Sequence, residues 1–151
     1  MDEILRWSPS HTRSNSGRYA RCTSRFDTIS LSFVFPSRML GEVYAMGRCH
    51  EGQLGIDQLS THLSQPTLIP TLSNIVDIAC GNHVSFATDR QGKVFSFGAG
   101  TSLQHGHGQE DVRVPRLMSS KFMDIKTVVS IAIGAQHTLF LTHDNPAKGE
   151  S

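Results

Sequence analysis

An internal repeat is the feature that most limits how this chain can fold. The segment GEVYAMG at 41–47 returns as GKVFSFG at 92–98, an offset of 51 residues (92 − 41). Three further segments return in the same order: 53–55 as 104–106, 66–69 as 115–118, and 76–81 as 129–134. Self-similarity at such a period is typical of repeat architectures, in which each unit is one small supersecondary structure.

Short segments rich in β-forming residues alternate with turns in each copy. Segments 43–46 and 94–97 are apolar or small on both faces, which predicts strands covered on both sides. Further strands are expected at 75–80, 84–88, 128–133 and 137–142. The proline-bearing segments 66–70 and 115–118 predict edge strands, because proline has no backbone donor. Four short strands per period, without a helix, are typical of a β-propeller blade.

The side-chain alternation of the third strand in each copy predicts one face with large apolar residues and one with smaller residues. Val129, Ile131 and Ile133 form a large apolar face, opposite Val128, Ser130 and Ala132. In the first copy Val76, Ile78 and Cys80 take the same places, opposite Ile75, Asp77 and Ala79. Cys80 therefore occupies the place of Ile133, which predicts a small, buried, unreactive side chain.

We therefore predict an all-β chain, a partial β-propeller of about two four-stranded blades with a flexible N-terminal arm. Repeat 1 covers 41–91, repeat 2 covers 92–144, and 145–151 form a tail. Ile29, Leu31, Phe33 and Phe35 alternate with other residues before Pro36, so 29–40 are interpreted as a strand remnant of a preceding repeat.

Residues 1–28 are predicted to be a disordered arm rich in arginine and serine. Residues 1–40 hold six arginines and three acids, a net charge of +3. A mitochondrial presequence is a competing interpretation, but Asp2 and Glu3 argue against it. An arm that touches nucleic acid or an acidic protein is another, and sequence from a truncated or alternative form of a longer gene is a third.

Composition excludes several classes of protein. The formal net charge is +1, which gives no reason to expect a DNA-wrapping protein. No apolar run approaches the roughly 20 residues needed to span a bilayer, so no membrane insertion is expected. Three cysteines, at 22, 49 and 80, without paired spacing argue against a disulfide scaffold and suit the cytoplasm or the nucleus.

The segments GEVYAMGRCHEGQLG, VDIACGNH, GKVFSFG and VVSIAIGAQHTLFLTHD resemble the regulator of chromosome condensation repeat over residues 41–144. The resemblance implies a seven-bladed propeller and a role in binding proteins. It also implies, for the founding member, nucleotide exchange on a Ran-like small GTPase. The structural repeat positions that it implies are Gly41, Gly47, Gly52, Gly55, Gly81, Gly92, Gly98, Gly106, Gly134 and His137.

The chain departs from the family pattern at several positions. Val84 stands where the family has histidine, Leu103 replaces the glycine matched by Gly52, and His105 replaces the leucine matched by Leu54. Two periods also cannot close a ring, because propellers have about 4–8 blades. We therefore expect either a fragment or isoform of a longer protein, or a chain that self-associates through its uncovered blade faces.

Three patterns suggest chemistry, and each has a structural alternative. His105 and His107, with His50 and Cys49, resemble part of a metal site but also fit a blade turn. Gly98-Ala-Gly100 resembles a phosphate loop, yet no helix follows it. His137 is expected to form a structural hydrogen bond inside the blade and has no nucleophile at a matching position. We predict no catalytic residue, no cofactor and no metal.

The leading functional hypothesis is a non-enzymatic protein-interaction module, with part of an exchange factor for a Ran-like small GTPase as the alternative. A protein partner, such as a small GTPase, is expected at the blade turns, within 48–65 and 99–114, since loops on a rigid scaffold commonly carry recognition. The charged or titratable residues there are Arg48, His50, Glu51, Asp57, Glu110, Asp111 and Arg113. Nucleic-acid binding is expected only through the arm.

Overall fold

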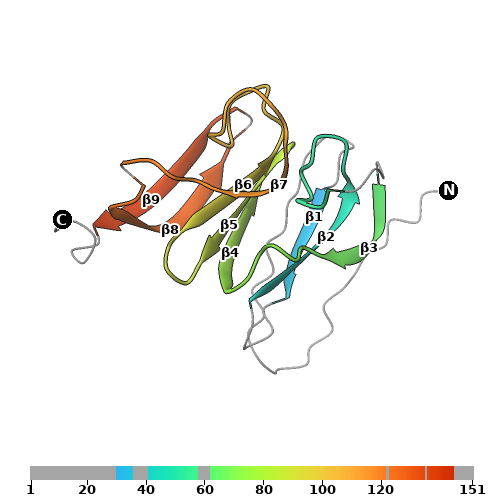
Figure 1. Cartoon of the computed structure of the whole chain (residues 1–151), viewed down its shortest axis with the longest axis horizontal. Coiled ribbons are helices and arrows are strands. Elements are labelled where there is room, and N and C mark those ends of the chain that lie inside the picture. The colour runs from blue at the N-terminus through green and yellow to red at the C-terminus, as the bar shows by residue number, and fades with distance from the viewer. Residues whose placement is uncertain (1–29, 36–40, 58–61, 122, 135, 145–151) are drawn as a thin grey trace.

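The computed structural model describes residues 30–35 by their backbone, and 41–57, 62–121, 123–134 and 136–144 in full. These residues form nine strands and no helix, which confirms the all-β prediction (Figure 1). No helix in this part of the chain is therefore long and apolar enough to cross a membrane. The predicted arm and tail lie outside the described residues. The strands are β1 (Ser30–Phe35), β2 (Glu42–Arg48), β3 (His62–Leu68), β4 (Ile75–Cys80), β5 (Val84–Asp89), β6 (Val94–Gly98), β7 (Val112–Leu117), β8 (Lys126–Ile133) and β9 (Thr138–Asp144).

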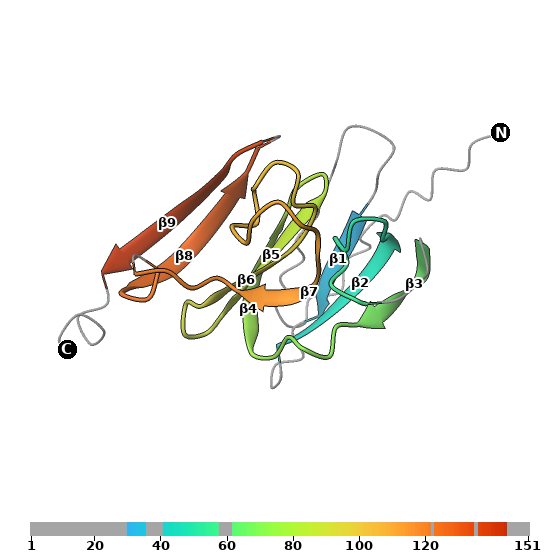
Figure 2. The ribbon, with the colours of Figure 1, turned by 45° about the horizontal axis from the view of Figure 1, so that its top comes forward.

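The strands form three antiparallel sheets that lie side by side, as Figures 1 and 2 show. Their orders are β1-β2-β3, β4-β5-β6-β7 and β8-β9. One sheet is thus a complete four-stranded blade, and the other two are partial. The proline-bearing strands β3 and β7 lie at sheet edges, which confirms their predicted place.

The complete sheet is offset from the sequence repeat. Strands β4 and β5 come from the first sequence copy, and β6 and β7 come from the second. The turn between β5 and β6 carries the boundary between the copies, at 91 and 92. A blade therefore joins two sequence repeats through a ladder in which Val84 lies opposite Gly98 and Thr88 lies opposite Val94.

Strand β1 occupies the same topological place against β2 as β5 occupies against β6. Ser30 lies opposite Gly47, just as Val84 lies opposite Gly98. The sequence repeat, in contrast, aligns Phe33 with Val84. Strand β1 therefore pairs with β2 in a register that differs from the one that the sequence repeat would give.

Two apolar cores lie between the three sheets. The first fills the space between β1-β2-β3 and β4-β5-β6-β7, and the second fills the space between that sheet and β8-β9. The first core contains Val43, Ala45, Cys49, Leu54, Ile56, Ile69, Leu72, Ile75, Ile78, Ala87 and Phe97. The second contains Val84, Phe86, Val94 and Val128, with Met118, Met123, Ile131, Ile133 and Phe140 packed against them.

A bulge in each inter-sheet strand reverses part of the predicted face assignment. The ladder is irregular between Ile75 and Asp77 in β4, and between Val128 and Ser130 in β8. Because a bulge inserts one extra residue, the alternation shifts there by one place. Ile75 and Val128, placed on the smaller face by the alternation, are therefore buried, and Val76 and Val129, placed on the large apolar face, are exposed.

The cysteine predictions need correction at Cys80. This residue is half-buried at the end of β4, opposite Ser85, and is disulfide-bonded. The prediction of Cys80 as a small, buried hydrophobic side chain is therefore wrong. Cys49, in contrast, is a free cysteine with only 2% of its surface exposed.

At each of the two junctions between sheets, one glycine joins a sheet to the next. The carbonyl of Gly41 accepts a hydrogen bond from the Ile75 amide at 3.1 Å, and that of Gly92 accepts from Val128 at 3.4 Å. Both glycines have positive φ, 55° and 74°. A Cβ on Gly92 would clash with Thr127 Cγ2, so a larger residue would push the sheets apart.

We predict that Gly92→Ala lowers the free energy of unfolding by about 2 kcal/mol or more, because strain at positive φ adds to the steric clash. Gly108→Ala is the matched control: φ is 107°, but nothing lies within 4 Å of an added Cβ. The control should cost about 1 kcal/mol from φ alone. Urea unfolding measures both variants. Equal losses in the free energy of unfolding would show that the close approach of Gly92 to the next sheet contributes nothing to stability.

Candidate functional site

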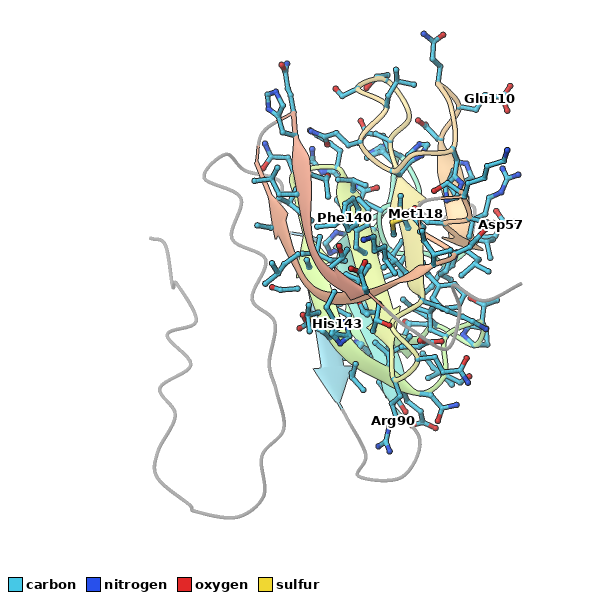
Figure 3. The ribbon with its side chains drawn as sticks, turned by 90° about the vertical axis from the view of Figure 1, so that its left-hand side faces the viewer. Asp57, Arg90, Glu110, Met118, Phe140 and His143 are labelled. Atoms are coloured by element: carbon cyan, nitrogen blue, oxygen red, sulfur yellow. The ribbon has the colours of Figure 1, made fainter. Side chains whose placement is uncertain are left out.

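Three connections of two adjacent sheets lie at one end of the molecule. They are 49–57 after β2, the turn 81–83 between β4 and β5, and 99–111 between β6 and β7; together we call them the loop end. The antiparallel ladders place the last two there, since Val84, Gly98 and Val112 lie side by side. Figure 3 shows Glu110 at this end and Arg90 at the opposite end.

The first loop packs onto the neighbouring sheet. Ser85 Oγ on β5 donates a 2.8 Å hydrogen bond to the Gln53 carbonyl, and Leu54 is fully buried. Gly55 lies so close to Phe97 and Pro115 that an added Cβ would approach both to about 3 Å. This loop therefore ties the first sheet to the complete blade.

The second loop repeats this arrangement one blade further on. The Gln104 carbonyl accepts a hydrogen bond from Thr138 Oγ1 of β9 at 3.5 Å. Gln104 is thus the repeat equivalent of Gln53, and Thr138 is the equivalent of Ser85. The repeated Gln-x-Gly segment therefore provides the same hydrogen bond between a loop and the neighbouring sheet in both copies.

Leu103 adopts the left-handed backbone of the glycine that it replaces. Its φ is 56°, against 78° for Gly52 at the equivalent position. Leu103 is 55% exposed, so little burial compensates for this strain. The loop keeps its shape because its own turn bonds, from Leu103 N to the Gly100 carbonyl and from Gly106 N to the Leu103 carbonyl, hold it.

We predict that Leu103→Gly raises the free energy of unfolding by up to about 1 kcal/mol, because relief of the strain outweighs the added chain entropy. The reciprocal change Gly52→Ala should lower it by about 2 kcal/mol or more, since a Cβ there would lie 2.5 Å from Arg113 Cα. Thermal or urea unfolding of both variants tests the pair. Destabilisation by Leu103→Gly would contradict the strain argument.

The histidines of the second loop are bonded within the loop itself. The His107 amide donates to His105 Nδ1 at 3.1 Å, so the proton of His105 is on Nε2, which donates to the Glu110 carbonyl. Ser96 Oγ donates to the His105 carbonyl at 2.7 Å and lies 2.9 Å from His107 Nε2. The two rings stack, with centroids 5.6 Å apart. These nitrogens shape the turn.

The other residues of the metal hypothesis are engaged elsewhere. Cys49 donates its thiol proton to the Ile56 carbonyl, and burial raises the pKa of this thiol. Among the described residues, no three His, Cys, Asp or Glu side chains are grouped as a metal ion would require. At the glycine-rich segment, the Gly100 amide donates to Asp111 Oδ1 at 3.0 Å, so a carboxylate of the chain occupies the place of a phosphate.

Burial lowers the pKa of His107 below its ordinary value and outweighs the hydrogen bond to the Arg116 carbonyl, which favours the charged ring; the positive charge of Arg116 lowers the pKa further. The folded state therefore favours the neutral ring. Its full contribution to stability is present above the unfolded pKa of about 6.5, and is lost as the pH falls toward the lower, folded pKa.

We therefore predict that the free energy of unfolding falls between about pH 7.5 and about pH 5.5, partly through His107. In His107→Gln the side-chain amide retains a donor near Nε2 but does not titrate, so the loss on acidification should be smaller. Urea unfolding at several pH values measures the difference. An unchanged pH dependence would show that this ring does not contribute.

Two polar contacts at the surface join the first loop to the neighbouring sheet. Glu51 Oε2 lies 2.5 Å from His83 Nδ1, which joins the first loop to the β4–β5 turn. Arg113 Nη2 donates to the His50 carbonyl at 3.3 Å. The sequence pointed to Glu51, His50 and Arg113 but not to His83, because His83 belongs to a turn of another sheet and no local pattern marks it as a partner of Glu51.

The remaining predicted positions are distributed between the loop end and the sheet joints. Arg48, Asp57 and Glu110 are exposed. His137 is also exposed, and its backbone carbonyl accepts from the Gly134 amide at 2.8 Å. The side-chain hydrogen bond expected for His137 inside a blade stays a prediction, since β8-β9 is an incomplete sheet among the described strands.

Comparison with known proteins places this architecture in a family. The model of the Regulator of chromosome condensation (RCC1) repeat matches residues 41–88 and 91–141. The chain belongs to the RCC1 repeat family. Each match begins at or just before the glycine that joins one sheet to the next.

The alignments with RCC1-repeat relatives cover most of this chain but only a small part of each relative. Regulator of chromosome condensation of Xenopus laevis is 41% identical over 102 residues, which are 67% of this chain and 24% of the relative. Guanine nucleotide exchange factor SRM1 of Saccharomyces cerevisiae is 40% identical over 112 residues, 70% of this chain and 23% of the relative. This chain thus spans about a quarter of the length of these two curated relatives.

A solved structure shares the fold. Prp20p of Saccharomyces cerevisiae, described with its binding to Gsp1p and histones, superposes with a TM-score of 0.69 at 17% identity. The match covers 83% of this chain and 33% of that chain. The three sheets are therefore a partial propeller of the RCC1 type.

Proposed function

We propose that this chain is a non-enzymatic protein-interaction module, a part of a longer propeller that acts as a scaffold or regulator. The loop end is the observation that carries this proposal. Its three connections come from two sheets; Glu51 and His83 join the first loop to the turn 81–83, and Arg113 of β7 donates to the His50 carbonyl of the first loop. Rigid loops that present exposed polar groups are favourable for binding a protein, because little entropy is lost on association.

The charge pattern of the loop end favours a polar protein surface as the partner. Arg48 is exposed at the end of β2, and Glu110 is exposed on the second loop. Charges of both signs set specificity and association rate more than raw affinity. Such a surface fits a folded protein with a mixed charge pattern better than it fits a polyanion.

The second candidate function is part of a guanine-nucleotide exchange factor for a Ran-like small GTPase. Two observations favour it: the name of SRM1 and the reported binding of Prp20p to Gsp1p. We further propose the nucleus as the place of action, because the relatives are named for chromosome condensation. The nucleic-acid hypothesis rests on residues 1–28, outside the described residues.

The experiment is a binding titration of the full chain with a purified Ran-type small GTPase and, separately, with core histones. Arg48→Ala and Glu110→Ala should each weaken binding about fivefold or more, as expected for a contact that contributes about 1 kcal/mol. Arg90→Ala, at the opposite end, is the matched control and should leave the affinity unchanged.

Nucleotide release from the GTPase separates the two candidate functions. Binding without faster release supports the interaction module, and faster release supports the exchange function. Weakening by Arg90→Ala but not by the loop-end variants would contradict the proposed surface. Absence of binding to both proteins would contradict these partner classes.

A further inference from the structure

The connection from β7 to β8 is four residues longer than the equivalent connection from β3 to β4. Each begins where an amide, of Ile69 or of Met118, donates at 2.8 Å to the neighbouring strand, β2 or β6. Each ends where the amide of Ile75 or of Val128 bonds to a glycine carbonyl. These two amides are six positions apart in the first connection (75 − 69) and ten in the second (128 − 118). Figure 2 shows the longer connection as the orange segment between β7 and β8.

Two adjacent serines hold the longer connection in place. The Ser120 carbonyl accepts a hydrogen bond from the Asp124 amide at 2.9 Å, and Ser120 Oγ accepts one from the Met123 amide at 3.1 Å. Ser119 Oγ donates to the carboxylate of Asp124, with both carboxylate oxygens at 3.3 Å. Met123, held by these bonds, packs against the second core. A single hydroxyl proton, on Ser119, therefore joins the start of the added segment to its end.

The hydroxyl of Ser119 is accessible and is flanked by positive charge. Ser119 is exposed and belongs to no strand. Arg116 lies three residues before it and Lys121 two residues after it, and both are exposed. In the first copy the uncharged Thr67 takes the place of Arg116, and the connection 69–75 contains no charged residue. The second copy alone thus combines an exposed serine with a preceding arginine, a pattern that is complementary to an acidic substrate groove.

We propose that Ser119 is a phosphorylation site for a protein kinase that recognises Arg116 through acidic groups in its substrate groove. Ser119 Oγ attacks the γ-phosphorus of ATP, so that an Oγ–P bond forms and the bond from this phosphorus to the bridging oxygen breaks. ADP leaves, and the hydroxyl proton passes to the catalytic carboxylate of the kinase. This proposal does not depend on the partner of the loop end.

The phosphorylated side chain is incompatible with the bond to Asp124. Its Oγ no longer carries a proton to donate, and the phosphate brings a charge of about −1.5 to −2 at pH 7. Repulsion between this charge and the adjacent carboxylate drives the two apart, and Arg116 and Lys121, the nearest cations along the chain, attract the phosphate. The bonds that Ser120 makes to Met123 and Asp124 then weaken. Phosphorylation therefore loosens the junction between the complete blade and β8-β9.

Phosphorylation of the full chain tests the site. The chain is incubated with ATP and a purified kinase that selects arginine three residues before serine, and mass spectrometry locates the phosphate. We expect modification at Ser119, none in Ser119→Ala, and a kcat/KM at least about tenfold lower for Arg116→Ala because the charge contact is lost. Arg90→Ala, at an exposed arginine of the β5–β6 turn, is the control and should leave kcat/KM unchanged. Modification of other serines only, or of Ser119 only in the heat-denatured chain, overturns the proposal.

Hydrogen exchange tests the structural consequence. The amides of Met123 and Asp124 should exchange at least about tenfold faster in the phosphorylated chain, because the bonds to Ser120 open more often. Ser119→Glu should shift exchange in the same direction. Ser73→Glu, at an exposed serine of the shorter connection, is the matched control and should leave these two amides unchanged.

The variant Asp124→Asn separates charge repulsion from a general disturbance of the connection. It removes the like charge that faces the phosphate, so phosphorylation of this variant should accelerate exchange by less than about threefold. Equal acceleration with and without the Asp124 carboxylate would show that repulsion is not the cause. Unchanged exchange after full modification of Ser119 would likewise overturn the proposed loosening of the junction.

Discussion

Burial between neighbouring sheets is the constraint on which the rest of this structure depends. The complete blade is apolar on both of its faces, so neither face can remain open to water at low cost. The chain meets this requirement with the same joint used twice: a glycine carbonyl bonded to the next sheet, and a loop carbonyl bonded to a hydroxyl on β5 or β9. Both joints depend on close backbone approach, and this explains why the positions that hold the fold are small residues in turns.

The loop end follows from the same joints. The loops after β2 and β6 pack on the next sheet because Gln53 and Gln104 present their carbonyls to Ser85 and Thr138. Once the loops are fixed in this way, their remaining polar side chains project outward from a rigid base. Packing between the sheets thus determines the shape of the surface that we propose for partner binding.

Sequence periodicity was sufficient to predict the nine strands, the edge position of the two proline-bearing strands and the family. It was insufficient for the faces of β4 and β8, because a bulge moves Val76 and Val129 outward without any mark in the alternation. The disulfide at Cys80 could not be predicted, since the spacing of three cysteines does not determine their pairing. At the candidate site, the charged loop residues were predicted, but the Glu51–His83 pair depends on the contact of two sheets. Only the three-dimensional structure brings these two side chains together.

The offset between blade and sequence repeat has a consequence for how such chains lengthen. A duplicated segment that is one repeat long does not form a separate domain. It is inserted at the turn between β5 and β6, separates two strands that were hydrogen-bonded, and gives each of them a new neighbour. Every added copy therefore contributes strands to two different sheets, so a longer propeller has no boundary at which it divides into independent domains.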